Sequence, residues 1–387
     1  MLTSGIDFLN FKIKVKKFSI KQKLVSIIKE KNQILDSLGK NYNNNFNEKI
    51  LRKYKKSSNF RVIGMGGSTL GTQTIYDFLK NKIKKNFSFI DNLQNTQKKN
   101  TKKKFTNIVV SKSGNTIETI VNFNILIKKN DKNIFITENK KSDLYFLAEK
   151  LKAEIIHHNN FIGGRYSVLS EVGMLPAELM GLKSNKFKQF NALIKNKNFI
   201  NALVSNVGST LYFIKKKKFN SIIINYDNKA ENLFKWYQQL IAESLGKKKK
   251  GLLPVVSNMP KDNHSVMQLY LDGFQNNFFT FFYTHEKKSE KIKNNYILSS
   301  QNYLKNKDLS KITFAQKKAT EIIFKKMNIP FRSFEIKKRD EKTLGELFSF
   351  FILETILIGK LLNLNPYDQP AVELIKKKIK NLLIQNS

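Results

Sequence analysis

The fold is decided by residues 60–71, which read FRVIGMGGSTLG. A short apolar run ends in glycine, and a helical pattern begins directly after the glycine-rich turn. In open parallel sheets such a turn lies at the carboxyl end of a strand, where ligands bind. Free amides at the start of the helix favour a bound anion, although a tight strand-to-helix turn has the same composition. Thr69 stands where the dinucleotide fingerprint needs its third glycine, and the Gly-Lys-Ser/Thr of a P-loop is absent.

The same alternation of strand and helix extends to both sides of this stretch and then repeats. It predicts parallel sheets with helices on both faces, in two α/β domains of similar design. The first set of predicted strands comprises residues 60–63, 87–90, 107–110, 133–137 and 153–157. The second set comprises residues 221–225, 252–256, 278–283, 296–299 and 331–336. Helices are expected over 70–79, 116–128 and 229–245.

A chain of 387 residues is too long for one ordinary core. We therefore expect an N-terminal helical extension (1–45), a first domain (46–185), a second domain (186–340) and a C-terminal helical arm (341–387). Only helix and loop are expected in the extension, and Pro176 is expected to break the segment that connects the domains. The longest apolar stretch, 347–358, contains Glu354 and is too short to span a bilayer, so it predicts a buried helix.

Composition excludes several classes of protein. The chain has no cysteine and only four histidines, which excludes disulfides, thiolate metal sites and an extensive histidine cluster. Hydrophobic residues make up 41%, so the chain is not mainly disordered. The N-terminal residues lack the long apolar segment of a signal peptide, and we expect a soluble cytoplasmic protein without a membrane partner.

The net charge of +40 does not by itself indicate a nucleic-acid partner. Only five of the 70 basic residues are arginine. The lysines are scattered along the whole chain together with many Asn, Ile and Phe residues, and all four residue types are encoded by A- and T-rich codons. Proteins that read bases or clamp phosphates usually rely on arginine. We therefore favour a biased amino-acid composition over a nucleic-acid-binding surface as the explanation of the charge. The lysine-rich run 98–104 is interpreted as a solvated loop.

A second loop, residues 111–116, comes directly after a predicted strand and reads SKSGNT. Its hydroxyls and lysine can all donate to phosphate oxygens, and the helix start adds free amides. A helix cap needs only one such residue, so the loop favours a phosphate cradle, with an ordinary cap as the alternative. The donors are Ser111, Lys112, Ser113 and Thr116, and Glu118 lies two residues further on.

Three further segments carry candidate catalytic groups. Arg165 in GGRYS (163–167) is one of only five arginines, and it is preceded by two glycines that allow close approach; a surface arginine is the alternative. Gln239 and Glu243 are four residues apart on one helix face, where the glutamate is either a general base or a solvated acid. His264 lies in a polar context that suits proton transfer, although a lone histidine is more often structural. Residues 365–376, NPYDQPAVELIK, open a last helix that carries Lys376.

Taken in order, these segments resemble the glucose-6-phosphate isomerase (phosphoglucose isomerase) family. The resemblance covers residues 64–377 and rests on GMGGSTLG (64–71), SKSGNTIET (111–119), GGRYSVLSEVGMLPAEL (163–179), QLIAESLGK (239–247), HSVMQLYLDG (264–273) and ELFSFFILETILIGKLLNLNPYDQPAVELIKK (346–377). It implies two sugar isomerase (SIS-type) αβα sandwich domains and a homodimer with a shared active site. It also implies interconversion of glucose 6-phosphate and fructose 6-phosphate through a cis-enediol, in glycolysis and gluconeogenesis, without metal or organic cofactor.

The resemblance also assigns roles to residues. Glu243 matches the base that moves a proton between C1 and C2, and Arg165 matches the residue that stabilises the enediolate. His264, reaching in from the neighbouring subunit, and Lys376 match residues assigned to ring opening. The phosphate loop matches Ser111, Lys112, Ser113 and Thr116; other substrate contacts match Gly67, Ser68, Gln239 and Gln369, and Glu118 matches a supporting carboxylate.

Two alternatives are retained. One is a non-catalytic sugar-phosphate-binding regulator of the same fold, which would keep the phosphate loop without the chemistry. The other is a polyanion-binding protein, motivated by charge alone. Acceptance of mannose 6-phosphate is not decided by these residues.

Overall fold

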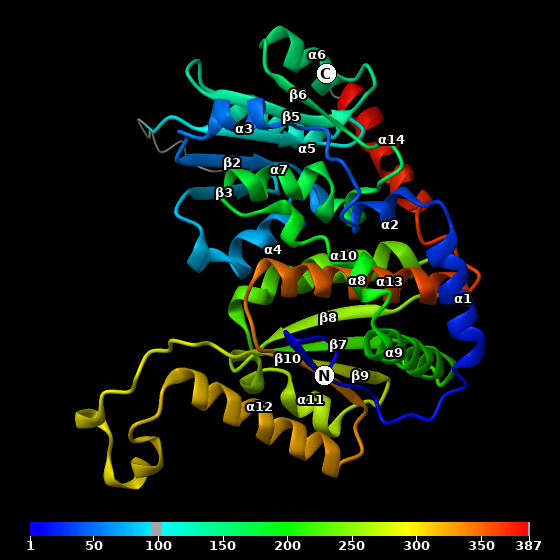
Figure 1. Cartoon of the computed structure of the whole chain (residues 1–387), viewed down its shortest axis with the longest axis vertical. Helices are drawn as coiled ribbons and strands as arrows, with labels where there is room; N and C mark the ends of the chain where they lie inside the picture. The colour runs from blue at the N-terminus through cyan, green and yellow to red at the C-terminus, as the bar shows by residue number, and fades with distance from the viewer. Residues whose placement is uncertain (95–102, 386–387) are drawn as a thin grey trace.

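The computed structural model describes residues 1–94 and 103–385, and it consists of two α/β units with helices packed between their sheets (Figure 1). The predicted fold class, two parallel-sheet sandwiches and a helical C-terminal arm, is confirmed. Most of the lysine-rich run 98–104 lies outside the described residues.

The first sheet has the strand order β3-β2-β4-β5-β6, and every neighbouring pair is parallel. Val62 and Ile108 pair across its central strands, and both are fully buried, as expected when helices cover both faces. The strands are β2 (Asn59–Ile63), β3 (Asn86–Ile90), β4 (Thr106–Val110), β5 (Lys132–Glu138) and β6 (Glu154–His158). The helices of this unit are α3 (Glu48–Tyr54), α4 (Leu70–Phe78), α5 (Ile117–Leu126), α6 (Asp143–Lys150) and α7 (Glu171–Leu179).

The second sheet has the order β1-β10-β9-β7-β8, in which only the edge strand β1 is antiparallel. Its strands are β1 (Ile6–Leu9), β7 (Asn220–Asn225), β8 (Leu253–Asn258), β9 (Asn277–Thr284) and β10 (Phe331–Ile336). The remaining helices are α1 (Phe18–Lys29), α2 (Gln33–Ser37), α8 (Phe190–Leu193), α9 (Lys197–Lys215), α10 (Glu231–Leu245), α11 (Met267–Asp272), α12 (Leu309–Lys326), α13 (Glu341–Leu361) and α14 (Pro370–Gln385).

The expectation of only helix and loop before residue 45 is wrong at β1. Residues 6–9 pair with β10, from Ile6 opposite Ile336 to Leu9 opposite Ser333. A four-residue edge strand has too few residues for a period-two pattern to stand out in the sequence. The N-terminal segment thus completes the sheet of the second unit.

A continuous core lies between the two sheets. It joins α4 of the first unit to α10 and α13 of the second, and Figure 1 shows α10 and α13 running between the two sheets. Two smaller clusters fill the outer faces, one beneath α5 and α6 and the other beneath α11 and α12. The predicted buried helix at 347–358 is confirmed, because α13 is buried from Thr343 to Gly359. No helix in the described part of the chain combines the length and the apolar character needed to cross a membrane.

Two further expectations are wrong. Residues 296–299 form no strand. They run from the end of the 3₁₀ turn η7 (Asn294–Tyr296) to the start of the 3₁₀ turn η8 (Ser299–Leu304), in the segment between β9 and α12. This segment projects from the body of the molecule in Figure 1. Pro176 does not break the connection but lies inside α7. The proline has no N–H to offer the carbonyl of Val172, and that carbonyl instead accepts a hydrogen bond of 3.1 Å from the Thr72 hydroxyl on α4.

Candidate active site

Arg165 lies at the centre of the junction between the two units. It occupies the turn η3 (Gly164–Leu169), and only 1% of the residue is exposed. Trp236 of α10 donates its indole N–H to the Arg165 carbonyl at 3.0 Å, which ties the turn to the second unit. The guanidinium donates to oxygens from two other segments of the chain: Ser244 Oγ (2.8 Å), Glu243 Oε2 (3.1 Å), Gln369 Oε1 (2.6 Å), Pro366 O (2.8 Å) and Asp368 O (3.0 Å).

Glu243 is in the last turn of α10, with about 29% of its side chain exposed. Gln239, one turn earlier on the same face, donates to Glu243 Oε1 at 2.9 Å, while Arg165 holds Oε2. Both carboxylate oxygens are therefore oriented, and the group still has access to solvent. The structure thus brings together Glu243, Arg165, Gln239 and Gln369, which the family resemblance had assigned to one site.

The glycine-rich turn packs directly against the arginine turn. A Cβ on Gly67 would lie 2.2 Å from the carbonyl carbon of Gly164 and 2.5 Å from the nitrogen of Arg165. Only glycine fits at such a contact. The turn η1 (Gly66–Ser68) therefore sets the position of the arginine backbone, and Ser68, the residue after Gly67, is half-buried beside it.

The second loop connects β4 to α5 and is held by contacts among its own side chains and with neighbouring segments. The Ser111 and Thr116 hydroxyls lie 2.7 Å apart, and Lys112 forms an ion pair with Glu138 at 3.4 Å. Gly114 has φ of +70°, and a Cβ there would meet the Ser142 hydroxyl at 1.9 Å. The remaining residues of this predicted site also lie here, with Ser113 exposed and Glu118 half-buried in the first turn of α5.

These two loops meet where ligands bind in open parallel sheets. They come after β2 and β4, which are neighbours, and the helices they lead into pack on opposite faces: α4 on the inner core and α5 on the outer one. In open α/β sheets, such a divergence forms the crevice at the carboxyl ends of the strands in which ligands bind. The sequence-predicted phosphate loop and the sequence-predicted glycine turn therefore share one edge of one sheet.

Within its own chain, His264 does not lie near Arg165 and Glu243. It is exposed in the turn η6 (Lys261–His264), which comes after the carboxyl end of β8. Glu243 is at the end of α10, the crossover helix between the parallel strands β7 and β8, so it lies at the opposite end of that sheet. Lys376 is exposed on α14, whose first residue is the one after Gln369.

Several residues that hold this site were not singled out in the sequence. Ser244 accepts from Arg165 Nε, and its hydroxyl lies 2.9 Å from the Tyr166 hydroxyl, which in turn donates to Pro366 O at 2.9 Å. Burial raises the pKa of Tyr166, so its hydroxyl stays protonated as a donor. Ser244 and Tyr166 are each the next residue after a predicted site residue, and that adjacency is the signal that could have indicated them.

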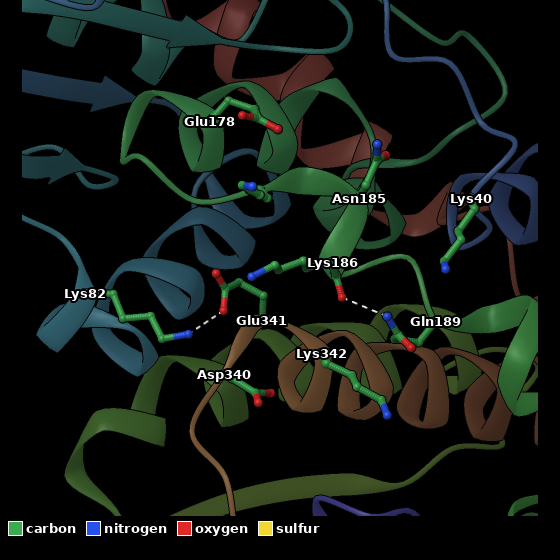
Figure 2. Close-up of a pocket in the computed structure, with 10 residues that line it drawn as sticks. Lys40, Lys82, Glu178, Asn185, Lys186, Gln189, Asp340, Glu341 and Lys342 are labelled. Atoms are coloured by element: carbon green, nitrogen blue, oxygen red, sulfur yellow. Dashed lines mark hydrogen bonds and ion pairs between the residues drawn. The ribbon is translucent and has the colours of Figure 1, made fainter.

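A separate cleft of about 860 Å³ lies between the units (Figure 2). Its carboxylates already have partners: Glu341 pairs with Lys82 at 2.5 Å, Asp340 caps α13 through the Thr343 amide, and Glu178 accepts from the Ser184 amide. It contains none of the predicted site residues. The cleft is therefore not the candidate active site.

The two parallel-sheet α/β units have the fold of the SIS-type phosphosugar isomerases. Two solved structures share the fold. One is a hypothetical protein from Thermus thermophilus, with a TM-score of 0.79, 21% identity and coverage of 95% of this chain and 94% of that one. The other is a glucose-6-phosphate isomerase from Chlamydia trachomatis, with a TM-score of 0.69, 17% identity and coverage of 94% and 78%.

Sequence comparison makes the family definite. The phosphoglucose isomerase family model matches residues 23–386. A glucose-6-phosphate isomerase from Methanocaldococcus jannaschii is 33% identical over 349 residues, which cover 84% of this chain and 85% of the relative. The chain belongs to the phosphoglucose isomerase family.

Proposed function

We propose that this protein interconverts glucose 6-phosphate and fructose 6-phosphate through a cis-enediol. The family assignment supports this reaction. One observation carries the proposal: Glu243 Oε2 lies 3.1 Å from Arg165 Nη1 at the junction of the two units, beside Gln369. A base and a fixed cation on one side of a crevice, with a hydroxyl-rich loop at the same sheet edge, match an aldose–ketose isomerase acting on a sugar phosphate.

In the proposed reaction the phosphate binds the loop formed by Ser111, Lys112, Ser113 and Thr116. Charge-assisted hydrogen bonds from this loop would anchor the substrate and position its carbon chain. Gly67, Ser68, Gln239 and Gln369 would contact the sugar, and Glu118 would support the site. These assignments rest on the placement of the residues around one crevice and on their match to the family motifs.

Glu243 is the proposed base. It would take the proton from C2 of the open-chain glucose 6-phosphate, and the electron pair of the broken C–H bond would form the enediolate. The same carboxyl group would return the proton to C1 while the hydroxyl proton of O2 passes to O1, which leaves the C2 carbonyl of fructose 6-phosphate. Gln239 holds one oxygen of this carboxylate, so the other is oriented for a defined proton transfer.

Arg165 is the proposed electrophile. Hydrogen bonds to backbone and side-chain oxygens fix the guanidinium before the substrate arrives. A fixed cation beside a developing oxyanion lowers the barrier without reorganisation. The non-catalytic regulator is less consistent with this arrangement, since a mere phosphate binder needs neither an oriented carboxylate nor a buried guanidinium.

His264 and Lys376 are proposed to open the sugar ring, with His264 supplied by a second copy of the chain in a homodimer. The exposed position of His264, at the end of the second sheet away from Glu243, supports this arrangement. The projecting segment between β9 and α12 also exposes apolar side chains that a partner would cover, namely Tyr296, Leu298 and Tyr303.

We also propose a cytoplasmic location and a role in glycolysis and gluconeogenesis, both of which the reaction implies. No nucleic-acid partner is proposed, because the charge is spread along the chain and comes mainly from lysine. The division into an extension (1–45), two domains (46–185 and 186–340) and an arm (341–387) is kept as a proposal, with β1 as a part of the second sheet.

A coupled assay from fructose 6-phosphate tests the function. We expect wild type to turn over and Glu243→Gln to lose at least about 10²-fold in kcat, the usual contribution of a general base. Glu231→Gln is the matched control, because Glu231 lies on the same helix in an exposed ion pair with Lys235. Absence of turnover by wild type, or equal rates for wild type and Glu243→Gln, would contradict the proposal.

A further inference from the structure

Four strands of the second sheet repeat the order and direction of four strands of the first, and only the fifth strands, β6 and β1, differ. Reading each sheet from the same edge, β3-β2-β4-β5 corresponds to β8-β7-β9-β10. The loop after β7 leads into α10 on the inner core, whereas the chain after β9 leads into α12 on the outer face. The ends of β7 and β9 therefore form a second switch point, equivalent to the one between β2 and β4.

A cavity of about 540 Å³ opens at this second switch point. Its walls include the end of β9 and residues that come directly after β7, β8 and β9, together with the first turns of α12 and the loop before α13. Its volume lies within the range of small-molecule sites, roughly 300–1,000 Å³. None of the residues proposed above for the isomerase reaction lines it.

The chemistry of this cavity differs from that of the phosphate loop. Where the first domain has a glycine turn after β2, the second has Asp227, whose carboxylate accepts from the Lys229 amide at 3.0 Å and the Thr284 hydroxyl at 2.6 Å. Where the first domain has SKSGNT after β4, the second has Glu286 near the end of β9. Two carboxylates at these positions repel a phosphate, and they accept hydrogen bonds from hydroxyl groups.

Arg339 supplies a donor that has no partner among the described residues. Its side chain is about nine-tenths buried, with 9% exposed, and it lines the cavity. Its Nη2 binds Asp227 and Glu286, each at 2.8 Å, and its guanidinium stacks on Phe78 of the first domain at 4.6 Å. Its Nε, however, is buried with no hydrogen-bond partner in the described part of the chain. A role in joining the domains accounts for the bonds at Nη2, but it leaves Nε without an acceptor, which costs free energy.

We propose that this cavity is a second small-molecule site, which binds an uncharged polyhydroxylated compound, that is, a sugar or polyol without phosphate. One ligand oxygen would accept from Arg339 Nε, and neighbouring hydroxyls would donate to Glu286 and Asp227. The charges that line the cavity balance, with Lys229, Lys288 and Arg339 opposite Asp227, Glu286 and Glu290, so a neutral ligand fits better than an anion. Tyr226 and Tyr283 add aromatic surface of the kind common in such pockets.

Saturation-transfer NMR and calorimetry with D-glucitol and myo-inositol test this site on the full-length protein, with the first-domain site kept filled by saturating fructose 6-phosphate. Saturable binding with a Kd on the order of millimolar or tighter is expected for at least one of the two. Arg339→Lys keeps the charge and removes Nε–H, and should weaken binding about tenfold, the effect of one charged hydrogen bond. Arg52→Lys, on the exposed face of α3, is the control and should bind as wild type does.

A second variant keeps the test valid if Arg339→Lys does not fold. The Thr313 hydroxyl bonds within α12 and takes no part in the ion network, so Thr313→Phe should fill the cavity from the helix and abolish binding. Isomerase rates should stay unchanged in both variants, which separates this site from the proposed active site. The proposal is overturned if neither polyol binds saturably, if Thr313→Phe binds as wild type does, or if inorganic phosphate binds there more tightly than the polyols.

Discussion

The two domains share the order of four parallel strands and differ in the loops that leave the equivalent strands. After β2 and β4 the first domain places glycines, hydroxyls and backbone amides, which suit an anion. After β7 and β9 the second places Asp227 and Glu286, held by Arg339. The same architecture therefore offers two ligand positions of different character, and the chemistry of the loops, not the sheet, decides which ligand each can take.

The second domain contributes Glu243 to the proposed reaction, and this residue lies at the end of the second sheet opposite the carboxyl ends of β7 and β9. Glu243 is at the end of α10, and the α4–α10 packing between the units brings it to Arg165. The domain interface is thus a part of the active site. Changes at this interface should have larger effects than changes at either crevice alone.

The largest effect after loss of the base is expected at Arg165. Arg165→Lys keeps a positive charge but cannot reproduce the fork that reaches Glu243, Ser244 and Gln369. We expect kcat to fall about 10²–10³-fold, the range seen when a preorganised donor to an oxyanion is removed. Steady-state kinetics measure this, with Arg52→Lys as the exposed control. A KM effect alone, with kcat retained, would show that Arg165 only binds substrate.

Gly67→Ala probes the contact between the glycine turn and the arginine turn. The new Cβ would lie 2.2 Å from the Gly164 carbonyl carbon, so one of the two turns must shift. A displacement on the order of 1 Å near the reacting groups costs about 10²-fold in rate. Gly181→Ala is a poor control because its φ is positive, whereas Gly163→Ala meets no atom closer than 3.9 Å and should retain most activity. Equal losses of activity in Gly67→Ala and Gly163→Ala would show that the contact between the two turns does not position the reacting groups.

The comparison of the two crevices is sharpened by matched hydroxyl deletions. Ser111→Ala combined with Thr116→Ala removes two proposed phosphate donors, and KM for fructose 6-phosphate should rise about 10- to 100-fold. Ser289→Ala, after β9 in the second domain, should leave KM unchanged. If the second-domain variant raised KM as much as the first-domain pair, the assignment of phosphate to the first crevice would be wrong.

The smallest effect concerns the outer layers. Apolar contacts hold α5 and α6 to the first sheet. Helix α12 has apolar contacts too, but its Lys317 and Lys318 also reach Glu335 of β10 at 2.5 and 2.6 Å. Burial alone would raise the pKa of Glu335, but the hydrogen bonds and charges of the two lysines outweigh it and lower the pKa to about 2. A lowered carboxylate pKa contributes stability above its unfolded value, and that stability is lost as pH falls from about 4.5 toward 2.

Hydrogen exchange should therefore show α12 opening before α6 as pH falls from about 5 to about 2.5. Glu335→Gln should remove this difference in pH dependence between the two helices. Equal acid sensitivity of α6 and α12 in the wild-type protein would contradict the account of the outer layers.

Much of the fold is readable in the sequence because its signals are local. The sequence predicts nine of the ten strands found in the described part of the chain, since buried parallel strands leave apolar runs between turn residues. Strand β1 escapes prediction because its pairing with β10 joins distant parts of the chain. The expectation for Pro176 is wrong because its tolerance inside α7 depends on the Thr72 hydroxyl of another helix.

The sequence predicts the main residues of the candidate site, but not the residues that hold them in position. Glu243, Arg165 and Gln369 stand in motifs, and the structure brings them together. The roles of Ser244, Tyr166 and the Pro366 carbonyl depend on three-dimensional contacts, which no spacing encodes. His264 lies away from Glu243 in its own chain because α10, the crossover helix between β7 and β8, carries Glu243 to the opposite end of the sheet.

The most direct test of the central claim is isomerisation in D₂O, with the product examined by NMR. If Glu243 moves a proton beside a fixed Arg165, glucose 6-phosphate formed from fructose 6-phosphate should carry deuterium at C2, and Glu243→Gln should lose exchange and turnover together. Turnover by wild type without any deuterium at C2, or exchange that persists in Glu243→Gln, would contradict the account.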